Sequence, residues 1–237
     1  MTAWQSRLER AVGTALIDRV PRDHEQPDAD FRRRRLVVAV VLVVGATLLG
    51  VSLSVRPGDP VFYPLTVAVA ATWTAGGLLS GPLHLGYATF RGALRRPIVT
   101  GLVIGVVAST VFIVVGALVV REIPLLHDYV ESLLAHARRG SLPLIALITL
   151  LNGVAEEIFF RGALFAAIGR RHPVVISTAF YAAASLATRN PMLVFAAVSL
   201  GLVLALQRRA SGGILAPIIT HVTWSMAMLF LLPPLFA

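Results

Sequence analysis

Two adjacent carboxylates and a distant histidine are the residues of this sequence whose types and positions could support chemistry. Glu156 and Glu157 lie in the segment GVAEEIFFRGALF, at 153–165, and His221 lies in GGILAPIITHVTWSMAM, at 212–228. A carboxylate can act as a general base on water. A histidine can orient a water, ligate a metal or stabilise an oxyanion. These residue types predict a hydrolytic site if the fold brings the two segments together.

The spacing around the two acids predicts different partners for them. Glu157 and Arg161 are four residues apart, so on a helix they share a face and form an ion pair. Glu156 points about 100° away from that face. It has no cation near it in the sequence, and Asn152 lies on its side, one turn earlier. We therefore expect Glu157 and Arg161 to be a supporting pair and Glu156 to face a wet cavity as the base. In the alternative, both acids pair with Arg161 and only lock the helices together.

His221 has one polar neighbour on its own helix face, Ser225, which follows four residues later. A lone histidine in an apolar segment serves more often as an interhelical hydrogen-bonding group than as a catalytic one. An acid in the same bundle favours a shared site instead, in which Glu156 and His221 act together.

The acids stand out because the rest of the chain has the composition of a membrane protein. Of its 237 residues, 57% are hydrophobic and 14% are charged, and the mean hydropathy is +0.80. A charge at the centre of a membrane helix costs about 2.5–3.5 kcal/mol, so an acid kept there indicates a functional group. The sequence has no cysteine, which excludes disulfides and thiol catalysis.

Apolar runs of about 20 residues predict an all-α fold, a polytopic transmembrane helical bundle of about seven spans. The spans are expected at 36–55, 61–81, 98–120, 142–168, 173–188, 192–207 and 214–233. The membrane domain then covers residues 36–237. Within it, Gly101 and Gly105 form a GxxxG pair, which serves either a dimer interface or, as we expect, close packing inside the bundle.

Two further segments have amphipathic patterns. Residues 1–35 are expected to be a cytoplasmic segment with a linker at 21–30. In this segment an apolar residue recurs every fourth position, at Trp4, Leu8, Val12 and Leu16. This pattern indicates either a helix on the membrane surface or a loosely ordered tail. Residues 125–140 have the pattern of an amphipathic surface helix.

The arginines predict how the chain is oriented. All 21 basic residues are arginines, and they gather at the ends of the apolar runs. With the N-terminus in the cytoplasm, fifteen lie in cytoplasmic segments, Arg161 lies within a span, and five lie outside: Arg56, Arg121, Arg138, Arg139 and Arg189. The bias predicts an integral protein of a bacterial cytoplasmic membrane with its N-terminus inside. We expect the lipid bilayer as a partner but no nucleic acid, because no basic stripe lies on a soluble element.

EEIFFRG at 156–162 resembles the EExxxR motif of the CAAX protease and bacteriocin-processing family (CPBP, also called Abi). This intramembrane protease family includes the type II prenyl-protein endopeptidases. SGGILAPIITH at 211–221 resembles the family's third motif region, and the resemblance covers a core at about 140–232.

The resemblance implies a role for each matching residue. Glu156 matches the catalytic glutamate that activates water, and Glu157 and Arg161 match its supporting pair. His221 matches the histidine of the HxxxN motif, which the family uses for oxyanion stabilisation or for metal binding. On this basis Glu156 and His221 are also the candidate ligands of a divalent metal such as zinc.

Two positions depart from the family's pattern. Counted without a gap from Pro173, the histidine of the second motif, FxxxH, falls on Thr188; counted from Phe180, it falls on Ala184. The asparagine of HxxxN falls on Ser225. Thr188 and Ser225 are therefore the substitutes at these motif positions, and both offer weaker hydrogen-bonding groups.

These observations predict an intramembrane endopeptidase of the CPBP type. In this enzyme, water activated by Glu156 attacks a peptide bond of a membrane-associated protein or peptide. The lost motif residues leave an alternative open, a catalytically silent CPBP-like membrane protein that binds another protein as a scaffold. A transporter or channel with Glu156 in its pathway is a third, weaker interpretation, because charged residues occur within a single span.

Overall fold

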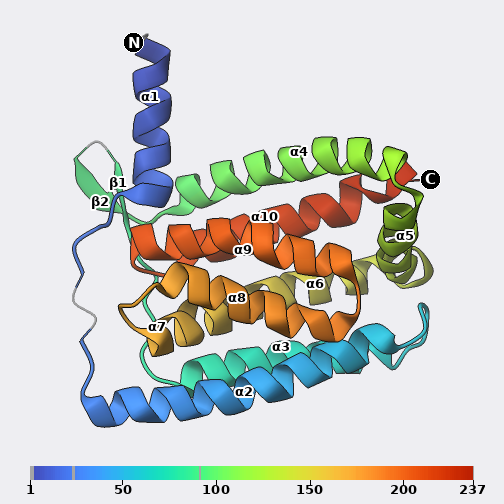
Figure 1. The fold of residues 1–237 in the computed structure, drawn as a ribbon, viewed down its shortest axis with the longest axis horizontal. Helices are drawn as coiled ribbons and strands as arrows, with labels where there is room; N and C mark the ends of the chain where they lie inside the picture. Colours follow the sequence, from blue (N-terminus) through green and yellow to red (C-terminus); the bar gives the residue numbers. More distant parts are fainter. Residues whose placement is uncertain (1–2, 23–24, 91, 237) are drawn as a thin grey trace.

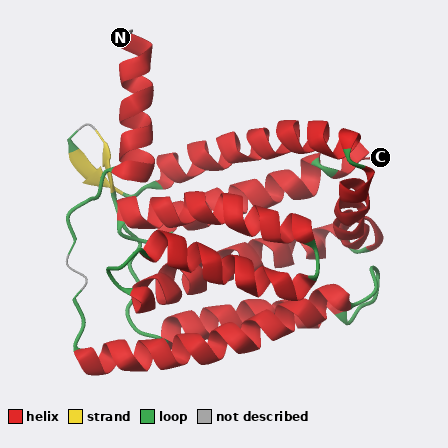
Figure 2. Cartoon of the chain, in the orientation of Figure 1, coloured by secondary structure: helices red, strands yellow, loops and turns green. Residues whose placement is uncertain are grey.

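A computed structural model describes residues 3–22, 25–90 and 92–236 as a bundle of helices that run side by side (Figures 1 and 2). Six helices of the described chain are long and apolar enough to cross a membrane, and a shorter apolar helical segment, Pro173–Thr188, accompanies them. The polytopic helical bundle predicted from the sequence is confirmed.

The helices follow the predicted spans closely. Their bounds are α2 Asp28–Ser54, α3 Phe62–Leu79, α4 Ile98–Glu122, α6 Leu142–Glu156, α8 Pro173–Ser185, α9 Pro191–Ser211 and α10 Leu215–Leu231. After α6 the helix continues through η2 (Glu157–Leu164) and α7 (Phe165–Ile168), and the 3-10 turn η3 (Leu186–Thr188) extends α8. Helix α2 begins eight residues before the first expected span. Pro27 precedes it, and Asp28 and Asp30 occupy its first turn, where the helix dipole favours acids.

The bundle has two different ends (Figure 1). At one end lie the connections 80–97, 169–172 and 212–214 together with the start of α2, and we call it the arginine-rich end. At the other lie the turn 55–61, the residues 186–190 and helix α5 (Pro124–Arg139), and we call it the α5 end.

Helix α5 lies across the α5 end, as its amphipathic pattern predicts. Val130 and Leu134 are buried against Leu126, Met192 and Leu232. Polar contacts then hold the helix to three neighbouring segments. His136 contacts the carbonyl oxygen of Val55 at 3.2 Å, Asn190 donates to the carbonyl oxygen of Tyr129 at 3.0 Å, and Arg138 donates to that of Pro233 at 3.2 Å.

The N-terminal segment forms helix α1 (Ala3–Val12) and a π-helical turn η1 (Gly13–Ile17), which run across the direction of the bundle helices (Figure 1). Trp4 and Val12 are exposed, as expected for an apolar stripe that lies on a membrane surface. The contact of this helix with the membrane remains a prediction. A short antiparallel hairpin, β1 (Ala88–Phe90) with β2 (Ala93–Arg95), was not predicted. Arg91, one of the arginines assigned to the cytoplasmic side, lies outside the described residues.

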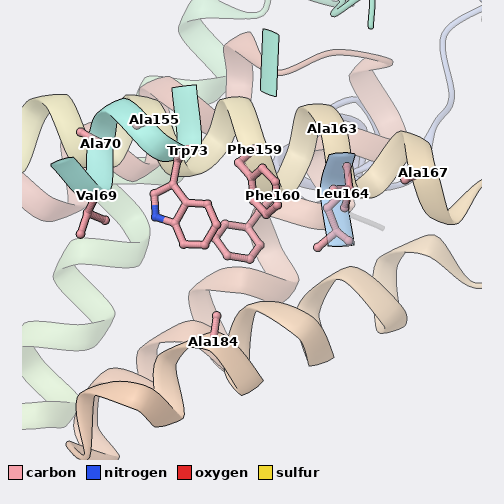
Figure 3. Packing of buried hydrophobic residues seen from close by; sticks show 11 residues of the cluster. Val69, Ala70, Trp73, Ala155, Phe159, Phe160, Ala163, Leu164, Ala167 and Ala184 are labelled. Atoms are coloured by element: carbon pink, nitrogen blue, oxygen red, sulfur yellow. The ribbon is translucent and has the colours of Figure 1, made fainter. Parts of the chain in front are cut away.

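Aromatic rings fix η2 against α3. The ring of Trp73 lies 4.6 Å from that of Phe159 and 5.1 Å from that of Phe160, measured between centroids (Figure 3). Gly77 allows this approach, because a Cβ atom there would lie 2.4 Å from Cγ2 of Ile158. The helix that carries the two acids is therefore held rigidly on this side.

The GxxxG pair packs α4 against α10 within the bundle, as expected. A Cβ atom on Gly105 would lie 2.7 Å from Cβ of Thr223, and one on Gly101 would lie 2.9 Å from Cβ of Ile219. Thr220 donates a hydrogen bond of 2.8 Å to the carbonyl oxygen of Gly101. This close contact fixes the position of α10, the helix that carries His221, against α4.

Gly105→Leu is expected to lower the free energy of unfolding in detergent by about 1–3 kcal/mol, the usual effect of overpacking. Gly116→Leu is the matched control, because nothing lies within 4 Å of a Cβ atom at that position of the same helix. Equal stability of the two variants would contradict the packing described for α4 and α10.

Candidate functional site

The acids lie where the fourth span changes from an α-helix to a π-helix. Residues Glu157–Leu164 form eight consecutive π-helical positions, and seven of these residues are buried. Such wide turns are rare and occur frequently at functional sites. The sequence analysis assumed an ordinary α-helix here, because the residue pattern gives no signal that separates the two helix types.

Glu157 is fully buried and binds two partners through one oxygen. Its Oε1 accepts hydrogen bonds from Nη1 of Arg161 at 3.0 Å and from Nδ1 of His221 at 2.8 Å. The predicted ion pair between Glu157 and Arg161 is thus confirmed. The contact with His221 was not predicted, since the sequence analysis associated His221 with Glu156 alone.

The contact with Glu157 defines the histidine tautomer. Glu157 is paired with a guanidinium and is therefore a carboxylate, which can only accept hydrogen bonds. Nδ1 of His221 must then carry a proton, and Nε2 is the atom left for other contacts. The Cδ2 edge of the ring, beside Nε2, lies 3.9 Å from where a Cβ atom would stand on Gly153.

His221 lies deeper in the bundle than its distance from the predicted start of the last span suggests. At about 1.5 Å per residue, eight residues of the last span put His221 roughly 12 Å from the membrane boundary, and the sixteen residues before the turn at 172 put Glu156 roughly 24 Å from it. The direct contact between His221 and Glu157 shows that this difference is wrong. The reason is that α10 starts inside the protein: residues 211–214 are buried, and Ile214 donates a hydrogen bond of 2.8 Å to the carbonyl oxygen of His84.

Glu156 has a partner that the sequence analysis missed. The hydroxyl of Tyr181, on α8, donates a hydrogen bond of 2.5 Å to its Oε2. The Tyr181 ring is itself held in place, because Arg161 lies 4.6 Å above it and Phe160 lies 4.6 Å away. A tyrosine within the apolar helix that follows the acids was the available signal.

One cavity of about 290 Å³ connects the predicted residues. Glu156, His221, Thr188 and Ser225 all line it, together with Asn152 and Tyr181. The structure therefore brings the predicted base and the predicted histidine to a common space. Glu156 is partly exposed, whereas Glu157 and Arg161 are fully enclosed.

The two substitutes at the motif positions differ in how far their hydroxyls are used. Thr188 donates a hydrogen bond of 2.7 Å to the carbonyl oxygen of Ser185 and accepts one of 3.2 Å from the backbone nitrogen of Asn190. Its hydroxyl hydrogen is thus committed to the local turn. Ser225 lines the cavity one helix turn beyond His221, so its side chain is better placed to donate to a bound group.

The described residues do not fit a catalytic zinc site. No group of three or more histidine, cysteine or acidic side chains that could hold a metal ion occurs in the described part of the chain. Glu156 and His221 alone leave the donor set one short of the three protein ligands that catalytic zinc usually takes. Glu157 does not complete the set, because its Oε1 is already shared by Arg161 and His221.

Comparison with known proteins agrees with this geometry. Residues 138–227, which include the acids and His221, match the family model described as type II CAAX prenyl endopeptidase Rce1-like. This part of the chain is therefore similar to that endopeptidase family, in agreement with the resemblance of its motifs. No curated protein and no solved structure gives a significant match.

Arg161→Leu is expected to lower the free energy of unfolding by about 3–5 kcal/mol, because it leaves the buried carboxylate of Glu157 without its guanidinium. Arg138→Leu is the control: it removes an ion pair with Glu131 whose side chains are 36% and 33% exposed and a hydrogen bond to the carbonyl oxygen of Pro233. Such contacts contribute about 0–1 kcal/mol and about 0.5–1.5 kcal/mol. Unfolding of both variants in detergent gives the two values. A loss for Arg161→Leu no larger than that for Arg138→Leu would contradict the structural role of the pair.

Proposed function

We propose that the protein is an intramembrane endopeptidase of the CPBP type that cleaves peptide bonds in membrane-associated proteins or peptides. The observation that carries the proposal is the common cavity of Glu156 and His221 within a region that matches the family. A partly exposed acid and a histidine with one ring nitrogen available are the groups that water-dependent acyl cleavage requires.

Glu156 takes a proton from a water molecule as the water oxygen attacks the carbonyl carbon of the peptide bond. The developing oxyanion accepts a hydrogen bond from Nε2–H of a protonated His221, and the hydroxyl of Ser225 is the second donor. The proton then passes from Glu156 to the leaving nitrogen, the C–N bond breaks, and a carboxyl group and an amine are released. No step requires a metal ion.

The charges of the site support this mechanism. Two carboxylates, Glu156 and Glu157, are balanced by Arg161 and by an imidazolium at His221, so the group is neutral as a whole. Glu157 lies 2.8 Å from Nδ1 of His221 and compensates the second proton on the ring. Neutrality lowers the cost of keeping four ionised groups within a membrane bundle.

Tyr181 supplies the positioning contact that the missing second-motif histidine would supply. Its hydroxyl holds Oε2 of Glu156 at 2.5 Å. Within the described residues Oε1 makes no hydrogen bond, so it is the oxygen available to a water in the cavity. This arrangement supports activity despite the absence of a histidine at Ala184 or Thr188.

Glu156→Gln is expected to reduce cleavage by about 10²–10⁴-fold, because an amide cannot accept the proton of water. His221→Ala is expected to reduce it by about 10²–10³-fold through loss of an oxyanion donor. The measurement compares the new N-termini of membrane proteins in cells that carry wild-type protein, each variant or a deletion. Asp59→Asn, at an exposed acid of the α2–α3 turn, is the control for an acid-to-amide change.

Tyr181→Phe is expected to lower kcat by about 10- to 150-fold, as loss of a hydrogen bond to a charged group of about 1.5–3 kcal/mol implies. The ring remains to pack on Phe160 and Arg161, so stability in detergent should change little. Activity equal to wild type would show that Glu156 does not need this contact.

The alternative is a catalytically silent scaffold, and the substitutions at the motif positions favour it. It predicts that Glu156→Gln and His221→Ala behave like wild type while the deletion has a phenotype. Loss of cleavage in the Glu156→Gln variant is by itself sufficient to exclude this alternative.

A further inference from the structure

The cavity reaches from the acids toward only one end of the bundle. At the level of the acids its walls include Trp73 and Leu200. Beyond that level the walls come from the parts of the helices nearer to α5: Leu53 is near the end of α2, Phe62 begins α3, Thr149 is at the middle of α6, and Leu193 is near the start of α9. Leu133, on α5 itself, also lines the cavity.

Toward the arginine-rich end the described residues close the bundle. Phe159 and Leu204 are fully buried there. Nη2 of Arg161 donates a hydrogen bond of 3.0 Å to the carbonyl oxygen of Gly201, and Nε of Arg208 donates one of 2.7 Å to that of Arg161. These hydrogen bonds join η2 to α9 on the side of the acids that faces the arginine-rich end, so the cavity ends there.

Helix α5 therefore lies over this end of the cavity, where Leu133 lines it, and Ile123 separates α5 from the span α4. Hydrogen bonds join α5 to Val55, to Asn190 and to Pro233, and Val130 and Leu134 pack beneath the helix. These contacts lie at the end of the bundle, so they can open locally while the spans stay packed.

We propose that substrates reach Glu156 from the α5 end, beneath helix α5, and that this end faces the non-cytoplasmic side of the membrane. This inference rests on the proposed function and adds the side of the membrane on which the peptide enters. The side follows from the arginines, since arginine-rich segments stay in the cytoplasm and fourteen of the described arginines lie at or toward the opposite end.

The size and lining of the cavity limit the substrate. A volume of about 290 Å³ is at the lower limit for ligand pockets, so it holds a short extended stretch rather than a helix. Its walls carry mainly apolar side chains, of which Leu53, Phe62 and Leu193 are examples. The substrate is thus an unwound, apolar segment of a membrane-associated protein, close to the non-cytoplasmic surface.

Cysteine labelling tests the route directly, because the chain contains no cysteine of its own. Thr149→Cys places a thiol in the cavity wall, and Leu193→Cys is a second cavity variant in case the first does not fold. Asp59→Cys marks the exposed surface of the α5 end, and Arg171→Cys marks that of the arginine-rich end. Each variant is treated with a charged, membrane-impermeant methanethiosulfonate, in intact spheroplasts and in inside-out vesicles.

The expected result is that the cavity thiols and Asp59→Cys react in spheroplasts, whereas Arg171→Cys reacts only in inside-out vesicles. Cavity thiols that react together with Arg171→Cys overturn the route, and so do cavity thiols that react from neither side. Reaction of Arg171→Cys in spheroplasts overturns the assignment of the side. Labelling does not depend on cleavage, so the two proposals can fail separately. If labelling is as expected but Glu156→Gln does not affect cleavage, the entry route stands and the proposed function is wrong.

Discussion

The position of Glu157 between Arg161 and His221 is the interaction on which the rest of the site depends. One oxygen of this fully buried carboxylate accepts a hydrogen bond of 3.0 Å from Arg161, in the same helical segment η2, and one of 2.8 Å from His221 on α10. A buried charge without such partners would be very costly, so the contact determines how α10 docks on the fourth span. The close packing of Gly101 and Gly105 brings α4 onto the other face of α10 and holds it there.

This arrangement gives the two adjacent acids separate roles. Glu157 is enclosed and neutralised, whereas Glu156 points to a cavity and is held by Tyr181 through a single oxygen. The same contact leaves Nε2 as the other ring nitrogen of His221, a residue that lines the cavity together with Glu156. An enclosed acid and an acid that lines a cavity can therefore occupy consecutive positions of one helix, because the π-helical turns and the neighbouring helices present them to different surroundings.

Much of this architecture could be predicted from the sequence. Apolar runs predicted the ends of the spans to within a few residues, except for the start of α2, and the spacing of Glu157 and Arg161 predicted their pairing, because both depend on local periodicity. The contact of His221 with Glu157 and that of Tyr181 with Glu156 could not be predicted, because they join helices far apart in the sequence. The depth of His221 was wrong for the same kind of reason: the start of α10 is set by the loop at His84, and helix rise alone cannot reveal it.

The most direct test of the account is the ¹⁵N NMR signal of the His221 ring in bilayers, assigned by comparison with His221→Gln. The account predicts that Nδ1 is protonated and hydrogen-bonded to a carboxylate, and that Glu157→Gln shifts its signal strongly while Glu156→Gln changes it little. A signal that responds to Glu156→Gln and not to Glu157→Gln would contradict the central contact.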